Sequence, residues 1–287
     1  MIASLIRRNC LGAAAFLLMA GVVPAALAEP GPAVSALNPN RPAPDGFLAP
    51  TLEGDWRVRV AADIWLPNAL EIEAFSASDG DGDYLRKDLI WLLEAIYFYF
   101  PFDFEVRKGR FGLLYHNFMV GLRPNDSVDI IGPITMDWEV WLLMFDVGIT
   151  YDLGRWRLWD APNAPELTLE PYFEARIIYL PIDITVDGSP SNEKLSSQVP
   201  VLGLHAFIDL TEHWNLQFIG DYGGWGVDNN HQTWQGAAYL GYRWPGWGLH
   251  WNLQVGYRAM RLFEMRQNDH DISMDARGAN ITFGAEF

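Results

Sequence analysis

The sequence predicts an all-β fold, an antiparallel barrel of about ten strands, and three observations carry this prediction. Apolar and polar residues alternate with a period of two in one segment after another, as in strands that have one apolar face. Gly, Pro and acidic residues separate these segments at short intervals, which indicates hairpins. After the first 28 residues, no uncharged apolar run is long enough for a spanning helix. The nearest, 89–102, contains Glu94 and Pro101.

The first 28 residues have the organisation of a secretory signal peptide. Arg7 and Arg8 form the basic start, Leu11 to Val23 form an apolar run too short to cross a bilayer, and residues 26–28 give a small-x-small cleavage site. Cys10 would leave with this segment. The mature chain is therefore expected to have no disulfide, no catalytic thiol and no cysteine metal site.

The remaining chain is acidic and rich in aromatic residues. Without Arg7 and Arg8 it has 18 basic and 36 acidic side chains, a net charge of −18, which argues against nucleic-acid binding. An aromatic content of 14% excludes an acidic disordered chain. Residues 29–54, rich in Pro, Ala and Asn, are expected to form a flexible leading segment, and residues 55–287 a single barrel domain.

Ten segments carry the strand pattern, with one ambiguity near the start of the barrel. Trp56 to Leu66 alternates cleanly, and Pro67 should bend or bulge the strand. Residues 70–74 either continue it, which gives about ten strands, or form a separate strand, which gives about twelve. Residues 84–94 have the apolar spacing of a short amphipathic helix in or beside the interior. The other expected strands are 98–107, 111–122, 141–151, 169–179, 202–209, 214–222, 234–243, 251–259 and 278–287.

The apolar faces of these strands have the features of a surface in contact with lipid. They contain no Asp, Glu, Lys or Arg, and a charge there would cost about 2–4 kcal/mol at mid-depth in a bilayer. Trp and Tyr bracket several strands in pairs, as aromatic rings do at the two interfaces of a membrane. The pairs are Trp214 with Tyr222, Trp234 with Tyr242, and Trp251 with Tyr257. The barrel is therefore expected to cross a membrane.

The closing segment resembles known membrane barrels. Residues 278–287 alternate and end on Phe287, and this ending resembles the last strand of bacterial outer-membrane barrels, where a terminal Phe belongs to the signal read by the insertion machinery. The resemblance implies the outer membrane of a Gram-negative cell, with lipid, lipopolysaccharide and the insertion machinery as partners. Short turns near 108–109, 211–212 and 245–246 would then face the periplasm. The longer acidic segments, near 79–83, 123–137, 187–197, 223–231 and 264–276, would form outer loops.

Several motifs widen this resemblance to most of the mature chain. The twin Gly-Tyr-Arg tripeptides at 241–243 and 256–258 are similar to those of a group of uncharacterised proteobacterial outer-membrane barrel proteins. Residues 66–67, 105–112, 167–172, 220–226 and 233–235 agree with the same group. The resemblance implies architecture and location, and it brings no reaction with it. Gly241 and Gly256 look like gaps beside a large neighbour, and Arg243 and Arg258 look like charge partners inside the barrel.

Charged residues on the inward faces are the candidate site residues. They are Glu105, Arg107, His116, Glu174, Arg176, His205, Asp209 and Arg258. A narrow barrel needs such residues to pair charges and fill its interior, so a structural role is the first interpretation. No His is followed two residues later by Ser, the arrangement of outer-membrane lipases. Asp269 to Asp271 could mimic the Asp and His groups of outer-membrane proteases.

The acidic run 79–83 resembles a calcium loop, but Tyr84 and Ile90 occupy the positions of the required Gly and Glu. We therefore assign no catalytic residue, no metal and no cofactor. The expected function is a structural barrel or a narrow passive passage for small solutes. A lipid-modifying enzyme or a carrier of small hydrophobic ligands is the alternative, and an adhesin is a third possibility that rests on the outer loops.

Overall fold

A computed structural model describes residues 56–76, 82–123, 136–161, 163–186, 189–267 and 270–287. The expected signal peptide and the leading segment 29–54 lie outside the described residues. The elements in order are β1 (Trp56–Ser76), β2 (Gly82–Asp88), α2 (Leu89–Ala95), β3 (Ile96–Lys108), β4 (Phe111–Leu122), β5 (Met136–Tyr151), β6 (Gly154–Arg157), β7 (Glu166–Val186), β8 (Ser189–Asp209), β9 (Trp214–Val227), β10 (Asn230–Gly246), β11 (Leu249–Gln267) and β12 (His270–Glu286).

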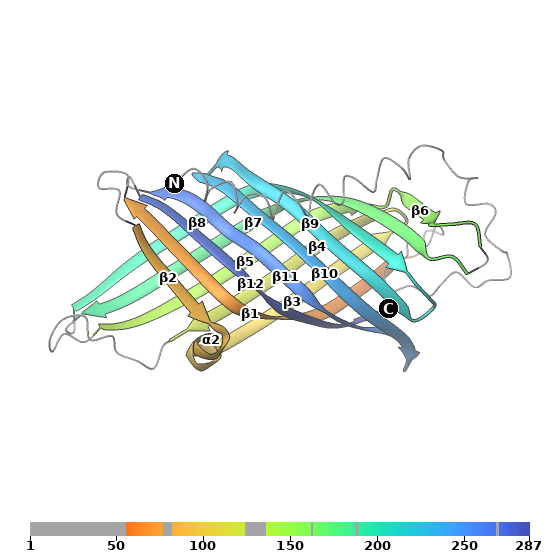
Figure 1. Ribbon diagram of the computed structural model, residues 1–287, viewed down its shortest axis with the longest axis horizontal. Coiled ribbons are helices and arrows are strands. Elements are labelled where there is room, and N and C mark those ends of the chain that lie inside the picture. Colours follow the sequence, from red (N-terminus) through yellow and green to blue (C-terminus); the bar gives the residue numbers. More distant parts are fainter. Residues whose placement is uncertain (1–55, 77–81, 124–135, 162, 187–188, 268–269) are drawn as a thin grey trace.

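Ten of these strands close into one antiparallel barrel. The order around the wall is β1, β3, β4, β5, β7, β8, β9, β10, β11 and β12, and β12 returns to pair with β1. The two short strands β2 and β6 add to the edges of β1 and β7 outside this ring. The long tilted strands run the length of the molecule in Figure 1. The prediction of ten strands is confirmed, and no helix in the described part of the chain is long and apolar enough to span a bilayer.

β1 is one strand with a bulge, as expected from Pro67. Its pairing with β12 shifts by one residue between Pro67 and Ala69, so that Asn68 is the extra residue. Pro67 cannot donate a ladder hydrogen bond, and a bulge absorbs that loss. The bulge also exchanges the two faces of the strand. Side chains at odd positions point inward before it, and side chains at even positions point inward after it.

The helix expected over 84–94 is shorter than predicted. Residues 82–88 form β2, which pairs with the free edge of β1, and α2 begins only at Leu89. The Asp88 side chain accepts a hydrogen bond from the Trp91 N–H at 3.0 Å and so caps the helix. An available strand edge in β1 overrides the helical spacing of residues 84–88.

Most of the expected outer loops are strands. Residues 189–197 belong to β8, 223–227 to β9 and 264–267 to β11, so the prediction of loops there is wrong. β9 and β10 meet in a two-residue turn in which Asp228 and Asn229 have φ of 51° and 57°, the conformation of a type I′ hairpin. The polar residues on both faces of these segments had led to the prediction of loops. The expected loop segments 79–81 and 124–135 lie outside the described residues.

The barrel interior has two halves of opposite character. One half contains the start of β1 and the end of β12, where Arg59 pairs with Glu286. Charged and amide side chains point inward in this half. We call this the polar half. In the other half a buried hydrophobic cluster fills the interior, and we call it the apolar half. The cluster consists of Trp65, Leu70, Leu92, Ala95, Phe118, Val120, Leu122, Leu142, Met144, Ile178, Leu180, Met260, Leu262, Phe263, Met265, Met274 and Ala276.

The outer surface changes from apolar to polar at the same height at which the interior changes from polar to apolar. On β12 the inward residues pass from Asn280 to Ala276 and Met274, while the outward residues pass from Ile281 to Asp275. Along part of its length the wall is therefore apolar outside and polar inside, and beyond that it is polar outside and apolar inside.

Candidate functional site

The centre of the polar half is the guanidinium of Arg176 on β7, which is fully buried. It donates to Asp146 on β5 at 3.1 and 3.2 Å, and to Asp221 on β9 at 3.0 and 3.3 Å. It also donates to Glu174 at 3.2 Å and to the Thr233 hydroxyl at 3.0 Å. Every strand from β5 to β10 except β8 and the short β6 therefore contributes a partner to this one cation, which ties that side of the wall together.

A second node lies around Arg107 on β3, towards the end of the barrel where β12 finishes. Its guanidinium donates to Glu105 and to both carboxylate oxygens of Glu170 on β7, with 2.7 Å from Nη1 to Oε1. Arg59 on β1 lies 3.6 Å from Glu105. Each strand offers only alternate residues to the interior, so charges from distant parts of the chain meet here.

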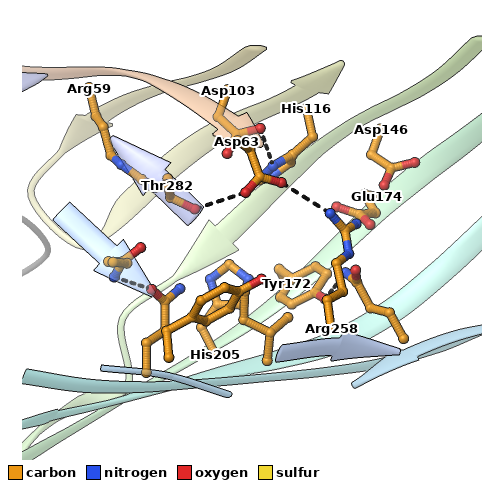
Figure 2. A pocket seen from close by; sticks show the side chains of 15 residues that line it. Arg59, Asp63, Asp103, His116, Asp146, Tyr172, Glu174, His205, Arg258 and Thr282 are labelled. Atoms are coloured by element: carbon orange, nitrogen blue, oxygen red, sulfur yellow. Dashed lines mark hydrogen bonds and ion pairs between the residues drawn. The ribbon is translucent and has the colours of Figure 1, made fainter. Parts of the chain in front are cut away.

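A third group joins the neighbouring strands β1, β12 and β11 on their inward face. Asp63 accepts from Arg258 at 3.1 Å, from the Asn280 amide at 2.7 Å and from the Thr282 hydroxyl at 2.8 Å. Figure 2 shows Asp63 between Thr282 and Arg258, with the His116 ring directed at Asp103. His116 Nδ1 and Asp103 Oδ1 are 3.2 Å apart.

A small cavity of about 40 Å³ lies between these groups. Its charged lining comprises the carboxylates of Asp63, Asp103, Asp146 and Glu174 and the guanidiniums of Arg59 and Arg258. This volume holds roughly three water molecules. Two of the four carboxylates, Asp146 and Glu174, also pair with Arg176 behind the lining, so the charges around the cavity are largely compensated. The cavity suits water better than an organic ligand.

Most of the sequence-predicted candidates gather in this network. Glu105, Arg107, Glu174, Arg176, His205 and Arg258 are buried inside the barrel, and His116 is partly buried beside Asp103. His205 packs its ring against Tyr172, with the ring centroids 4.5 Å apart. Asp209 instead pairs with Arg243 near the turn after β8, away from the cavity lining.

Sequence reasoning missed seven charged or aromatic members of the site. They are Arg59, Asp63, Asp103, Asp146, Glu170, Tyr172 and Asp221. The six charged residues lie on strand faces that were predicted to point inward, so their charge was a sufficient signal. Tyr172 is buried, and its hydroxyl donates to Asp221 at 2.8 Å. An aromatic residue in a membrane strand reads as an interface residue, which is why this signal was ambiguous.

The ionised side chains of the network pair with one another. The carboxylates around Arg176 and Arg107 are all engaged, and the described residues contain no group of three His, Cys, Asp or Glu side chains arranged to hold a metal ion. Gly241 and Gly256 act as the expected gaps, since a Cβ there would lie 2.4 Å from the Asn215 side chain and 2.5 Å from the Tyr239 ring.

No protein-family model and no curated protein matches the chain. Among solved structures, it is similar to the outer membrane protease OmpT from Escherichia coli, with 10% identity, a TM-score of 0.46, and coverage of 83% of this chain and 98% of that one. It is similar to the attachment invasion locus protein Ail of Yersinia pestis, with 9% identity, a TM-score of 0.33, and coverage of 80% and 99%. A FadL homologue of Pseudomonas aeruginosa gives 8% identity, a TM-score of 0.27, and coverage of 81% and 90%. Likeness at this level assigns neither a family nor an activity to this chain.

Proposed function

We propose that this protein is an integral outer-membrane β-barrel that is closed at rest, with a structural role and at most a narrow passage for water and small solutes. The observation that carries the proposal is the outward belt on all ten barrel strands. Outward residues from Val58 to Leu66 on β1, from Ile149 to Trp141 on β5 and from Ala285 to Ala279 on β12 include no ionised side chain. In water, such a belt would expose a large apolar surface; in a bilayer, lipid covers it.

Aromatic side chains border this belt on both sides, which supports the same proposal. At the margin near the turn after β10, Trp214, Tyr242, Trp244, Trp251 and Phe283 form a chain of ring contacts with centroids 4.9–6.4 Å apart. At the other margin Tyr222, Trp225 and Tyr257 are 37–50% exposed. Rings at both margins are expected where a barrel meets two membrane interfaces, and lipid and lipopolysaccharide would then be its immediate partners.

Two features of the interior support a closed barrel. The cavity in the polar half has a volume of only about 40 Å³, and the apolar half above it is packed with side chains that are at most 7% exposed. A passage through hydrophobic packing would strip an ion of its water without replacing it.

A matched pair of substitutions on β7 and β8 tests the membrane assignment. Ile177 on β7 lies on the outward face within the belt, and Ser196 on β8 lies on the outward face beyond the belt and is exposed. Ile177→Lys should destabilise the inserted barrel by about 2–4 kcal/mol, measured as the urea midpoint in lipid vesicles, whereas Ser196→Lys should have little effect. Equal effects of the two substitutions, or recovery of the wild-type protein in the soluble periplasmic fraction, would contradict the proposal.

Conductance in planar bilayers tests the closed interior. The wild-type protein, inserted and confirmed as folded by heat-modifiable gel migration, should give no steady ion steps. Large and persistent steps would show an open pore and refute the closed state.

A further inference from the structure

The barrel wall is not continuous between β1 and β3. The ladder between them runs from Trp56 opposite Lys108 to Ala61 opposite Asp103. Beyond the bulge, β1 pairs with β2 instead, from Ala69 opposite Asp88 to Phe75 opposite Gly82. Residues 62–68 of β1 thus have no strand partner on this edge among the described residues. We call this interval, with residues 96–102 of β3 opposite it, the seam.

One side chain closes the seam from the β3 side. The Tyr99 hydroxyl accepts a hydrogen bond from the Trp65 N–H at 2.7 Å and donates one to the Trp65 carbonyl at 3.0 Å. A tyrosine thus takes the place of the neighbouring strand at this position. Its ring, like that of Trp65, packs edge-on against Phe118, with centroids 5.6 and 5.7 Å away.

The helix α2 lies at one end of the seam, because β2 ends at Asp88 opposite Ala69 and β3 begins at Ile96, and the helix is apolar on both sides. Leu92 and Ala95 are 5% and 2% exposed and belong to the apolar cluster of the interior. Ile90 and Leu93 are 67% and 53% exposed on the opposite side. In Figure 1 the helix lies against the side of the barrel, away from both of its ends. An exposed apolar helix face on a membrane barrel is one that lipid can cover.

The interior behind α2 is adaptable as well as apolar. Four methionines, Met144, Met260, Met265 and Met274, belong to the cluster. Methionine side chains are unbranched and repack easily around a foreign apolar group. Where the cluster meets the polar half, the buried indole N–H of Trp65 has no hydrogen-bond partner in the described part of the chain, so hydrogen bonding at the seam is incomplete although the ring is packed.

We propose that the seam is a lateral access route through which one acyl chain of a membrane lipid enters the apolar half and binds among the methionines. This inference rests on the proposed membrane location. The occupant is a hydrocarbon chain because the seam opens from an apolar belt into an apolar interior. The carboxylates Asp63 and Asp103 lie on the polar side of Trp65 and disfavour a charged carboxylate that reached further in. Separation of Tyr99 from the Trp65 backbone opens the route.

Photolabelling tests the route. The protein is folded into vesicles of a phosphatidylcholine that carries a diazirine at the end of one acyl chain, irradiated, and mapped by mass spectrometry. Leu253 and Val255 on the outward belt report contact with bulk lipid, Met260 and Met274 report the apolar half, and Val201 in the wall of the polar half serves as an interior control.

We expect labelling of the belt and of Met260 and Met274, and none at Val201. Tyr99→Phe, which keeps the ring packing, should increase labelling of the two methionines about fivefold, the factor for loss of a typical hydrogen bond. Tyr172→Phe is the matched control, because it removes a buried hydroxyl that bonds Asp221 on β9, remote from β1 and β3. Both variants must retain heat-modifiable migration.

Labelling of the belt without labelling of the methionines, in the wild type and in Tyr99→Phe alike, would overturn the lateral route and leave the membrane barrel intact. Equal increases in Tyr99→Phe and Tyr172→Phe would also overturn it, because the seam would then have no special role. An unlabelled belt would instead show that the membrane location itself is wrong.

Discussion

The two halves of the barrel interior differ in what surrounds the wall outside them. In the polar half the wall faces outward with Ile281 and Phe283, and the inside holds ionised groups such as Arg176 and Glu174. In the apolar half the outside carries residues such as Arg277 and Asp275, and the inside is filled with hydrophobic side chains. In the proposed membrane location, the medium outside each half accounts for the character of the inside. Strands next to lipid would direct their polar residues inward, and strands next to water would direct their apolar residues inward.

The halves are also stabilised differently. Apolar packing is tolerant, because neighbours of similar volume can replace one another. A buried ionic network is not, because removal of one partner leaves the others charged and unpaired. The comparison predicts that single substitutions in the polar half have larger effects than substitutions of similar size in the apolar half.

The largest effect is expected at Arg176. Arg176→Gln would leave Asp146, Glu174 and Asp221 without their common cation, and we expect a loss of at least 3–5 kcal/mol in unfolding free energy, measured by urea titration in vesicles. Arg277→Gln is the control, since the Arg277 side chain is 48% exposed on the outer surface, pairs with Glu71 at 3.0 Å and should contribute about 0–1 kcal/mol. Similar losses in both variants would break the distinction between buried and surface pairs.

The apolar half should give a graded response at Ile178, which is 1% exposed. Ile178→Ala removes buried methylene groups and should cost about 2–5 kcal/mol, whereas Ile178→Val should cost about 0.5–1.5 kcal/mol. The measurement is the same urea midpoint. If Ile178→Ala lowered the unfolding free energy by less than Ile178→Val does, the cluster would be too loosely packed to close the barrel.

The belt could be predicted from the sequence, because strand alternation is a local signal. The outward faces of β9, β10 and β11 follow it residue by residue. The apolar half could not be predicted, and β1 shows the reason. Leu66 and Leu70 both stand at even positions and read as one lipid face, yet the extra residue at the bulge turns Leu70 inward. A one-residue irregularity changes the face of everything that follows it.

The candidate site could be predicted as a set of inward charges but not as a set of pairs. Arg176 and Asp221 are 45 residues apart, and their contact depends on the stagger of strands around the barrel. The local pattern gives the face of a side chain and not its height relative to other strands. The seam could not be predicted from the sequence either, because it depends on which strand pairs with the edge of β1.

A smaller effect is expected at Gly203, on the wall of the polar half. The Tyr172 ring lies over this glycine, and a Cβ there would be 2.1 Å from Tyr172 Cζ. Gly203→Ala should therefore displace the ring from Asp221 and cost about 1–3 kcal/mol. Gly236→Ala on the outward face, where a Cβ meets nothing within 4 Å, should be close to neutral. Equal costs would show that the polar half is less tightly packed than its hydrogen bonds indicate.

The smallest effect concerns Asp152, just after β5 and outside the belt. Burial raises the pKa of its carboxyl above the usual value, although the carboxylate accepts the Gly154 N–H at 2.7 Å. The folded state thus binds this proton more tightly than the unfolded state, and its contribution to stability is lost as pH rises through the raised pKa. Asp152→Asn keeps an acceptor for Gly154 without the charge. The difference in melting temperature between variant and wild type should be near zero at pH 3 and should favour the variant by pH 7. A difference in melting temperature that is constant with pH would show that ionisation of Asp152 does not destabilise the folded protein.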